Sequence, residues 1–332
     1  MRPLVSAVIA TYNRAHVVCE SIDSILHQSY PNIELIVVDD GSTDQTQQML
    51  KSYDDKIRVV YQKNSGPAAA WNRGIKESQG EIIAFLGSDD IWLPTFVERQ
   101  VSVLQQAGPE VPCSLSNSWL GFASGAGTTS FQNTNLKPAF DEGIWLNPAE
   151  VFLTRFVLFG QSVAIRRSAL EEVGLFDETL WYLEDLDLAV KLGVGKSWGF
   201  IREPLVVWRQ STTDSLSQKG MNRQRVELVE NRLKIYSRLL PKVSEAGNTA
   251  RFQKLLNREL AQVHLELKAE KLGESSTWGA GTLAKSIRFI RKCQGYIYKK
   301  SSSYPQMEIA QFDRLPVNEH DAALSVLASP HP

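Results

Sequence analysis

Two pairs of adjacent aspartates stand where short apolar stretches of the sequence end. Asp39-Asp40 follows the stretch 34–38 (ELIVV), and Asp89-Asp90 follows the stretch 81–86 (EIIAFL) after a Gly-Ser dipeptide. Four carboxylates that meet in one place repel one another, so they require a cation or hydrogen-bond donors. Mg²⁺ prefers one or two carboxylates together with substrate phosphates, and Mn²⁺ suits the same oxygen ligands. The two pairs therefore indicate a site for a metal-bridged nucleoside diphosphate.

A third acidic pair, Glu184-Asp185, opens a predicted helix over 184–192. Acids in the first turn of a helix interact favourably with the helix dipole, and this effect alone would explain the pair. A carboxylate at that position would also serve as a general base for the proton of an alcohol. The residues by themselves leave both interpretations open.

The usual glycine-rich phosphate loops are absent from the sequence. It contains neither the GxxxxGK[ST] pattern nor a GxGxxG pattern after the first predicted strand. Neutralisation of a diphosphate would therefore depend on the metal and on scattered basic residues.

The elements that must position these acids alternate along the first third of the chain. Short apolar runs rich in β-branched residues predict buried strands, and apolar residues at helical spacing between them predict helices. This order predicts an α/β fold, a mostly parallel sheet with helices on both faces, in which ligands bind beyond the carboxyl ends of the strands. The predicted strands are 4–10, 34–38, 57–61 and 81–86, and the predicted helices follow a cap at Asn13, span 44–53, open with Pro67 and start near Pro94.

The middle of the chain predicts further strands. One strand lies within 111–120, a glycine- and serine-rich loop follows over 121–143, and another strand covers 160–166, with Ser168 capping a short helix. Two more strands are predicted in 196–208, on either side of Pro204.

Beyond about residue 213 the pattern becomes helical. Residues 221–240 and 248–272 carry apolar residues at three- and four-residue spacing among charges. We therefore divide the chain into a catalytic domain, a helical region and a loose tail. The domain covers 1–213, with a donor half to about 110 and an acceptor half from 111, the helical region covers 214–300, and the tail covers 301–332.

The segment 285–300 is basic and contains aromatic residues but no acid. Such a segment suits the surface of an anionic membrane, which would agree with a lipid-linked acceptor. It would equally suit a solvated basic face or a face between helices. The sequence leaves both interpretations open.

Composition narrows the class of protein. The chain has 332 residues, 43% hydrophobic residues and a net charge of −1, so we expect about two globular domains and no general nucleic-acid binder. It lacks an apolar run of about 18 residues and a signal peptide. Its three separated cysteines, Cys19, Cys113 and Cys293, form no disulfide framework and fit a reducing cytosol. A cytoplasmic location is therefore expected.

Four stretches of the sequence resemble the inverting family-2 glycosyltransferases with the GT-A fold. The similarity covers about residues 4–210, in the family's order and spacing. It implies transfer of a sugar from a nucleotide-diphosphate donor, expected to be a UDP-sugar, to a hydroxyl of a saccharide or lipid-linked acceptor. It also implies Mg²⁺ or Mn²⁺ and a role in cell-surface polysaccharide or glycolipid synthesis. The stretches are AVIATYNR, SILHQSYPNIELIVVDDGSTDQT, NSGPAAAWNRGIKESQGEIIAFLGSDDIWLP and GLFDETLWYLEDLDLAVKL.

The resemblance assigns the nucleotide side of the site to residues of the donor half. Thr11 would line the nucleotide pocket. Asp39 and Asp40 would contact base and ribose, with Asp40 receiving the hydrogen of a uracil-type imide. Asn64 and Gly66 would lie near the ribose or the phosphates.

The resemblance also assigns metal and catalysis. Asp89 and Asp90 would both contribute, one to the metal and one to the ribose. Asp185 would be the general base for the acceptor hydroxyl, and Glu184 would orient the base or the acceptor. Trp181 would either stack on a sugar ring or pack in the core.

The chain departs from the family pattern at three places. Gly87 stands where most members carry the first acid of the Asp-Ser-Asp-Asp motif, and Trp71 stands where an arginine is common, with Arg73 as an open substitute. The family's later histidine is missing from 207–211, so Arg209 becomes the candidate for phosphate, or else a surface arginine.

Two other functions remain open at this stage. A nucleotidyltransferase also places acids at strand ends around a metal-bound nucleotide, but it normally has a glycine- and basic-rich loop after the first strand. A non-catalytic nucleotide-sugar-binding protein would have lost its metal site, and Gly87 is the one sign of that. Retention of Asp89, Asp90 and Asp185 argues for the transferase.

Overall fold

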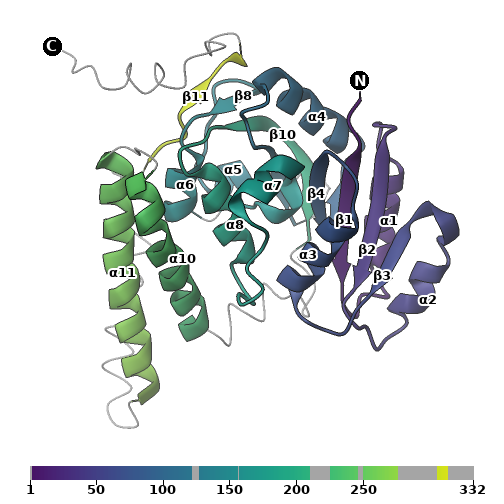
Figure 1. Ribbon diagram of the computed structural model, residues 1–332, viewed down its shortest axis with the longest axis horizontal. Helices are drawn as coiled ribbons and strands as arrows, with labels where there is room; N and C mark the ends of the chain where they lie inside the picture. Colours follow the sequence, from purple (N-terminus) through teal and green to yellow (C-terminus); the bar gives the residue numbers. More distant parts are fainter. Residues whose placement is uncertain are drawn as a thin grey trace.

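Four parallel strands form the half of the sheet that carries the first two acid pairs. β1 (Val5–Thr11), β2 (Ile33–Asp39), β3 (Arg58–Tyr61) and β4 (Ile82–Gly87) lie in the order β3-β2-β1-β4 in this computed structural model. The side chains of β1, β2 and β4 are largely buried on both faces because helices cover both sides, as the apolar runs predict, whereas β3 at the edge leaves Arg58 and Tyr61 exposed (Figure 1). The structure describes residues 2–121, 127–155, 157–209, 225–245, 250–275 and 305–312.

The other half of the sheet is mixed. β10 runs parallel to β6, whereas β9 is antiparallel to both β4 and β6 and so joins the two halves. The complete order is β11-β8-β10-β6-β9-β4-β1-β2-β3, with β5 paired to β10 and β7 to β6. The added strands are β5 (Ile91–Trp92), β6 (Cys113–Leu120), β7 (Thr128–Thr129), β8 (Glu142–Trp145), β9 (Val163–Arg166), β10 (Trp198–Trp208) and β11 (Ile309–Ala310).

The two faces of the sheet have separate hydrophobic cores. One face packs on α1 and α4, and the opposite face packs on α3, α6, α7 and α8 (Figure 1). The α/β architecture and the GT-A fold predicted from the sequence are therefore confirmed. The helices of this part are α1 (Val18–Leu26), α2 (Thr46–Lys51), α3 (Pro67–Glu77), α4 (Phe96–Ala107), α5 (Ser130–Asn133), α6 (Pro148–Thr154), α7 (Arg167–Val173) and α8 (Glu184–Gly193).

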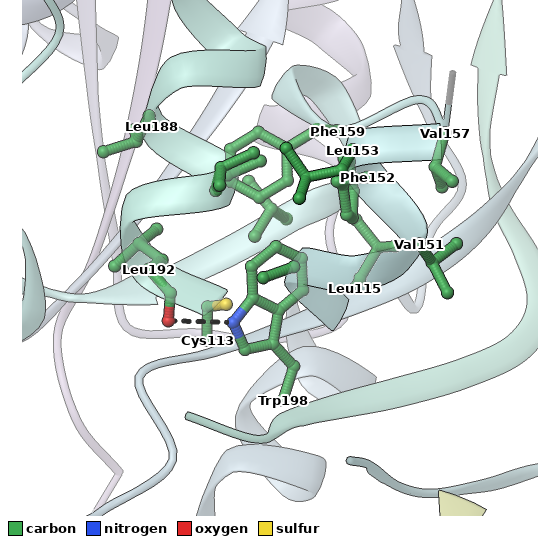
Figure 2. Packing of buried hydrophobic residues seen from close by; sticks show 14 of the residues in the cluster. Cys113, Leu115, Val151, Phe152, Leu153, Val157, Phe159, Leu188, Leu192 and Trp198 are labelled. Atoms are coloured by element: carbon green, nitrogen blue, oxygen red, sulfur yellow. Dashed lines mark hydrogen bonds between the residues drawn. The ribbon is translucent and has the colours of Figure 1, made fainter. Parts of the chain in front are cut away.

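The larger core gathers around Trp198 at the start of β10 (Figure 2). The indole is fully buried, and its N–H donates to the carbonyl oxygen of Leu192 at 3.2 Å. Phe152 and Phe159 lie against it, with ring centroids 5.2 and 5.5 Å away. These contacts tie α8, which carries the third acidic pair, to the sheet.

Two long helices follow the domain and pack on it. α10 (Arg225–Glu245) and α11 (Ala250–Ser275) lie side by side, with α10 between α11 and the sheet domain (Figure 1). Tyr236 of α10 is buried in the same core as α8, and its hydroxyl donates to the Leu153 carbonyl at 2.8 Å. The predicted helical region is thus an integral part of the larger core.

Several local predictions are wrong. The stretch 121–143 contains β7, α5 and the start of β8 instead of one loop, because Thr129 and Gln132 form a capping box there. The predicted strand pair of 196–208 is one strand, β10, with a register shift around Pro204. Ser168 does not cap α7, which begins at Arg167.

The expectation of a loose tail fails for residues 305–312. β11 pairs with β8, and the backbone N–H of Leu146 donates to the Glu308 carbonyl at 2.7 Å. Free edge groups of β8 explain this pairing. The basic segment 285–300 lies outside the described residues. Within the described ranges, no helix has the length and apolar character needed to cross a bilayer.

Candidate active site

Polar side chains converge where β1, β2 and β4 end. Thr11 of β1 pairs in register with Asp39 of β2, and Asp90 follows the end of β4. All three are buried, and one oxygen of each, Thr11 Oγ1, Asp39 Oδ2 and Asp90 Oδ2, has no hydrogen-bond partner among the described residues. Buried oxygens without donors are costly in a folded chain unless a ligand completes them.

The loop after β1 is held by the loop after β2. Asn13 has φ of 53°, and its Oδ1 accepts the N–H of Thr43 at 2.8 Å. Its own N–H donates to Ser42 Oγ at 2.9 Å, and the Arg14 N–H donates to Thr46 Oγ1 at 2.9 Å. The prediction that Asn13 caps a helix is therefore wrong, since α1 begins at Val18. The segments 11–13 (TYN) and 41–43 (GST) instead hold each other through these hydrogen bonds, beside the ends of the strands.

Asp40 holds the loop that leads into α3. Its Oδ1 accepts from Gln62 Nε2 at 2.7 Å and from the Ser65 N–H at 2.9 Å, and its Oδ2 accepts the Gly66 N–H at 2.9 Å. Three donors from the chain thus occupy a carboxylate that the sequence assigned to the base. Asn64 is exposed on the same loop. The nucleotide contacts of Thr11, Asp39, Asp40, Asn64 and Gly66 stay predictions.

The second acid pair lies between β4 and the end of β10. Asp90 Oδ1 accepts the backbone N–H of Arg209 at 2.9 Å. Burial, followed by the charge of Asp89, raises the pKa of Asp90 well above its usual range. The Arg209 guanidinium forms an ion pair with Glu20 of α1. The backbone of Arg209 is therefore beside the acid pair, and the contact of its side chain with phosphate stays a prediction.

Arg14 is a residue that the sequence reasoning missed. Its Nε lies 3.8 Å from Asp89 Oδ2, and its side chain is largely buried. It is a cation directly beside the proposed metal-binding acids. The sequence did contain a sign of this position, because Arg14 is the last residue of the TYNR motif, two residues after Tyr12.

Gly87 accommodates the acid pair. A Cβ at this position would lie 2.6 Å from Asp90 Oδ2 and 3.2 Å from Asp89 Oδ1. The two carboxylates occupy the space that a side chain at Gly87 would need.

We expect Gly87→Ala to weaken the binding of UDP with Mn²⁺ by about tenfold, which corresponds to about 1.4 kcal/mol. The added methyl group would push Asp90 from its position. Gly160→Ala is the matched control, because a Cβ there meets nothing within 4 Å. Calorimetric titration measures both variants, and equal affinities would contradict the packing argument.

The third acid pair lies at the start of α8. Leu183, just before it, has φ of 66°, an uncommon conformation for a residue with a branched side chain. Asp185 Oδ1 accepts the Leu186 N–H at 2.8 Å. Burial, followed by the charge of Asp185, raises the pKa of Glu184 to about 8. Burial also raises the pKa of Asp185, against the hydrogen bond from Leu186.

Glu184 therefore keeps its proton near neutral pH, because burial and the charge of Asp185 disfavour its ionised form. A protonated carboxyl group is a hydrogen-bond donor, and an ionised Asp185 beside it would be an acceptor for a proton. Raised pKa values in two neighbouring carboxyl groups are typical of catalytic sites.

Trp181 lies three residues before this third pair and contacts the loop at the start of α3. Its indole lies over Gly66, because a Cβ on Gly66 would be 3.5 Å from Trp181 Cη2 and Cζ3. Gly66 has φ of 91°, and its N–H is the donor to Asp40. The segment before Glu184 thus touches the loop that Asp40 holds, although about 115 residues separate the two in sequence. The other side of the indole is exposed, at 48% for the residue.

The residues of α3 that depart from the expected pattern, Trp71 and Arg73, make contacts within the fold. Trp71 packs edge-on to Phe85 with centroids 5.2 Å apart, so it belongs to the core. Arg73 forms an ion pair with Glu77 one turn along the helix, at 2.9 Å. Asn72 donates to the Phe176 carbonyl and accepts its N–H, both at 3.0 Å. The sequence did not identify Asn72 as the link between α3 and the segment of Trp181.

The acids present fit a metal bound together with a diphosphate. In the part of the chain that the structure describes, no three His, Cys, Asp or Glu side chains form a cluster that could hold an ion alone. Asp89 and Asp90 supply two carboxylates, and Asp90 Oδ2 lacks a partner. Two carboxylates plus phosphate oxygens is a common ligand set for Mg²⁺.

A sequence model described as "Glycosyl transferase family 2" matches residues 6–174. An uncharacterized glycosyltransferase of Rickettsia typhi is 35% identical over 229 residues, which cover 65% of this chain and 68% of the relative. A putative teichuronic acid biosynthesis glycosyltransferase of Bacillus subtilis, TuaG, is 40% identical over 109 residues, covering 32% of this chain and 43% of the relative. The chain spans only 31% of the length of a similar Rickettsia felis glycosyltransferase.

Two solved structures share the fold at low sequence identity. Residues 1–349 of S. aureus TarS, in complex with UDP-GlcNAc, give a TM-score of 0.61 at 18% identity, covering 79% of this chain and 72% of that chain. The mannosyltransferase PcManGT from Pyrobaculum calidifontis, in complex with GDP-Man and Mn²⁺, gives 0.56 at 20% identity, covering 89% and 82%.

Proposed function

The chain belongs to glycosyl transferase family 2, and from that premise we propose that it is an inverting, metal-dependent glycosyltransferase. It moves a sugar from a nucleotide-diphosphate donor, a UDP-sugar, to a hydroxyl of an acceptor. The contact of Trp181 with Gly66 supports the proposal, because it joins the segment that precedes Glu184 to the loop that Asp40 holds, where donor and base must meet.

The chain's own residues account for the proton transfer. Asp185 accepts the proton of the acceptor hydroxyl while that oxygen forms a bond to the anomeric carbon. The bond from this carbon to the diphosphate breaks on the opposite face, so the configuration inverts. Glu184, which keeps its proton at neutral pH, donates a hydrogen bond that orients the acceptor or the base. A base of this kind contributes about 10²–10⁴-fold to the rate.

Asp89 and Asp90 would hold the metal, with Arg14 as a further positive charge beside Asp89. A bound Mg²⁺ or Mn²⁺ supplies Lewis-acid stabilisation of the negative charge on the leaving diphosphate. Gly87 leaves the space in which the two carboxylates meet.

The acceptor is a saccharide or a lipid-linked saccharide used in the synthesis of cell-surface polysaccharides or glycolipids. The transfer takes place in the cytoplasm. The printed names of TuaG and the UDP-GlcNAc bound by TarS support this choice of substrates. The family membership argues against the nucleotidyltransferase alternative. The retained acids at the start of α8 argue against a protein that only binds nucleotide sugars.

The test is a panel of UDP-, GDP- and dTDP-sugars incubated with the full chain, with and without Mn²⁺. We expect release of the nucleotide diphosphate from one donor, dependent on the metal and faster with a saccharide acceptor. An inverted anomeric centre in the product, detected by NMR, would support the mechanism. If no nucleotide diphosphate is bound or released, the proposal is wrong.

We expect Glu184→Gln to make the protein more stable at alkaline pH. The folded pKa of about 8 lies above the ordinary value of 4.5, so between these values the folded state keeps a proton that the unfolded chain loses. Stability therefore falls as the pH rises through this window, and the loss is complete above about 8. Glutamine removes this loss, a gain of about 1–2 kcal/mol at the upper end.

Denaturant titrations across this pH window measure the effect. The exposed Glu171→Gln is the matched control, and its stability should follow that of the wild type. A Glu184→Gln curve parallel to the wild-type curve would show that Glu184 is ionised in the folded protein.

A further inference from the structure

The segment 174–183 connects α7 to α8 and carries Trp181 to Gly66. One side of this segment is held by α3, where Asn72 bonds both backbone groups of Phe176 and donates to Glu178 Oε1 at 2.8 Å. This contact belongs to the nucleotide half of the domain. Asp177, Thr179 and Tyr182 of the same segment are held by a second element.

Side chains of α10 make this second set of contacts. Arg238 and Lys234 both pair with Asp177 Oδ2, the lysine at 3.5 Å, and Lys234 also donates to Thr179 Oγ1. One turn earlier, Asn231 Nδ2 donates to the Tyr182 carbonyl at 3.3 Å. Three side chains of one helix face thus contact three points of the segment. The last of these points is next to Leu183.

The carboxylate of Asp177 is positioned to pair with both of these cations. Its Oδ1 accepts the Thr179 N–H at 2.9 Å, which leaves Oδ2 for the two cations of α10. Burial disfavours its charge, but hydrogen bonds from Thr179 and Arg238 and the charge of Lys234 outweigh burial and hold the pKa of Asp177 well below its usual range. The carboxylate therefore stays ionised and paired at working pH.

α10 is rigid where it makes these contacts. Ile235 and Leu239 are buried in the larger core, and Tyr236 is fixed to Leu153 by its hydroxyl. The other face of α10 packs on α11, where Arg232 pairs with Glu266 at 3.0 Å. A helix anchored on two sides can hold the segment 174–183, in addition to the contacts that Asn72 and Gly66 make with it.

We propose that α10 positions the Glu184-Asp185 pair, with Arg238 and Lys234 as positioning residues that act through Asp177. The inference rests on the proposed function. The ion pairs fix the segment, the segment fixes Trp181 on Gly66 and Leu183 in its left-handed conformation, and these set the direction of the first turn of α8. The helical region thus contributes to turnover without touching donor or acceptor.

The test compares the full chain with Arg238→Gln and with the Lys234→Gln/Arg238→Gln double variant. We expect turnover of the donor found in the panel to fall by about 10–100-fold in the double variant, since small misplacements of a catalytic group have effects of this size. The Kd of UDP with Mn²⁺ should stay within about twofold of wild type, because the nucleotide side is held by Asn72 and Asp40. Arg238→Lys should retain most of the turnover.

Two further measurements separate positioning from a general loss of stability. Hydrogen exchange should increase over 177–186 in the double variant and stay unchanged over 113–120. Glu230→Gln, which removes an exposed ion pair between α10 and Lys271, is the matched control and should change neither turnover nor exchange.

Failure of the proposed function and failure of the role of α10 give different results. A wild-type chain that binds no UDP and turns over no donor would refute the proposed function, and this inference with it. An active wild type whose double variant keeps full turnover, or loses UDP binding and turnover together, would overturn the role of α10 alone.

Discussion

Replacing Asp185 with asparagine is expected to abolish sugar transfer while nucleotide binding is kept. The amide cannot accept the proton of the acceptor hydroxyl, and the loss should be at least about 100-fold in kcat. In the proposed function the donor binds at the strand ends and at the loop held by Asp40, and neither contains Asp185. The Asp185 Oδ1 contact with the Leu186 N–H can be kept by the amide oxygen, so the start of α8 should stay folded.

Single-turnover measurements with the donor and a saccharide acceptor separate the two effects. Asp141→Asn, an exposed aspartate on another part of the surface, is the matched control and should retain full rate. Equal losses of donor affinity and rate in Asp185→Asn would assign this residue to the nucleotide site instead of the proton transfer.

Replacing Asp89 with alanine should remove the metal dependence of donor binding. Asp89 is the more accessible acid of the pair, so its loss affects the ligand set more than the fold. With Asp90 as the one remaining carboxylate, the affinity for UDP in Mn²⁺ should fall by about 100-fold, to the level seen without metal. Arg14, which lies beside Asp89 in the wild type, would remain as a positive charge near the phosphates.

Calorimetric titration of UDP with and without Mn²⁺ checks this, and Asp55→Ala, an exposed aspartate after α2, serves as the control. A variant that still gains affinity from Mn²⁺ would place the metal elsewhere. Removal of the metal from the wild type with a chelator should reproduce the Asp89→Ala result.

Strands β1, β2 and β4 could be predicted from sequence because each is largely buried on both faces. A continuous apolar run such as 34–38 leaves few other structures available to the chain, and the polar residue that ends it marks the sheet edge. Pro67 at the start of α3 was predictable for a similarly local reason, since its fixed φ suits the first helical position.

Predictions failed where a residue obtains its partner from far along the chain. Asn13 looks like a helix cap, but its side chain bonds Thr43 in the loop after β2. The single strand β10 and the paired β11 follow from neighbours on the sheet rather than from their own residues. Trp71 is apolar in a motif position, and only the positions of Phe85 and Phe176 show that it packs in the core.

The sequence by itself determined the kind of chemistry, because carboxylates after buried strands and at the start of a helix are a local pattern that needs no partner to be recognised. It could not determine which carboxyl group is charged, since the pKa of Glu184 depends on burial and on Asp185. Nor could it determine that an indole from one segment rests on a glycine of another, or that α10 holds that segment through Asp177. Only packing of the complete chain brings those groups within reach, because contacts between residues so far apart depend on how the sheet and both cores assemble.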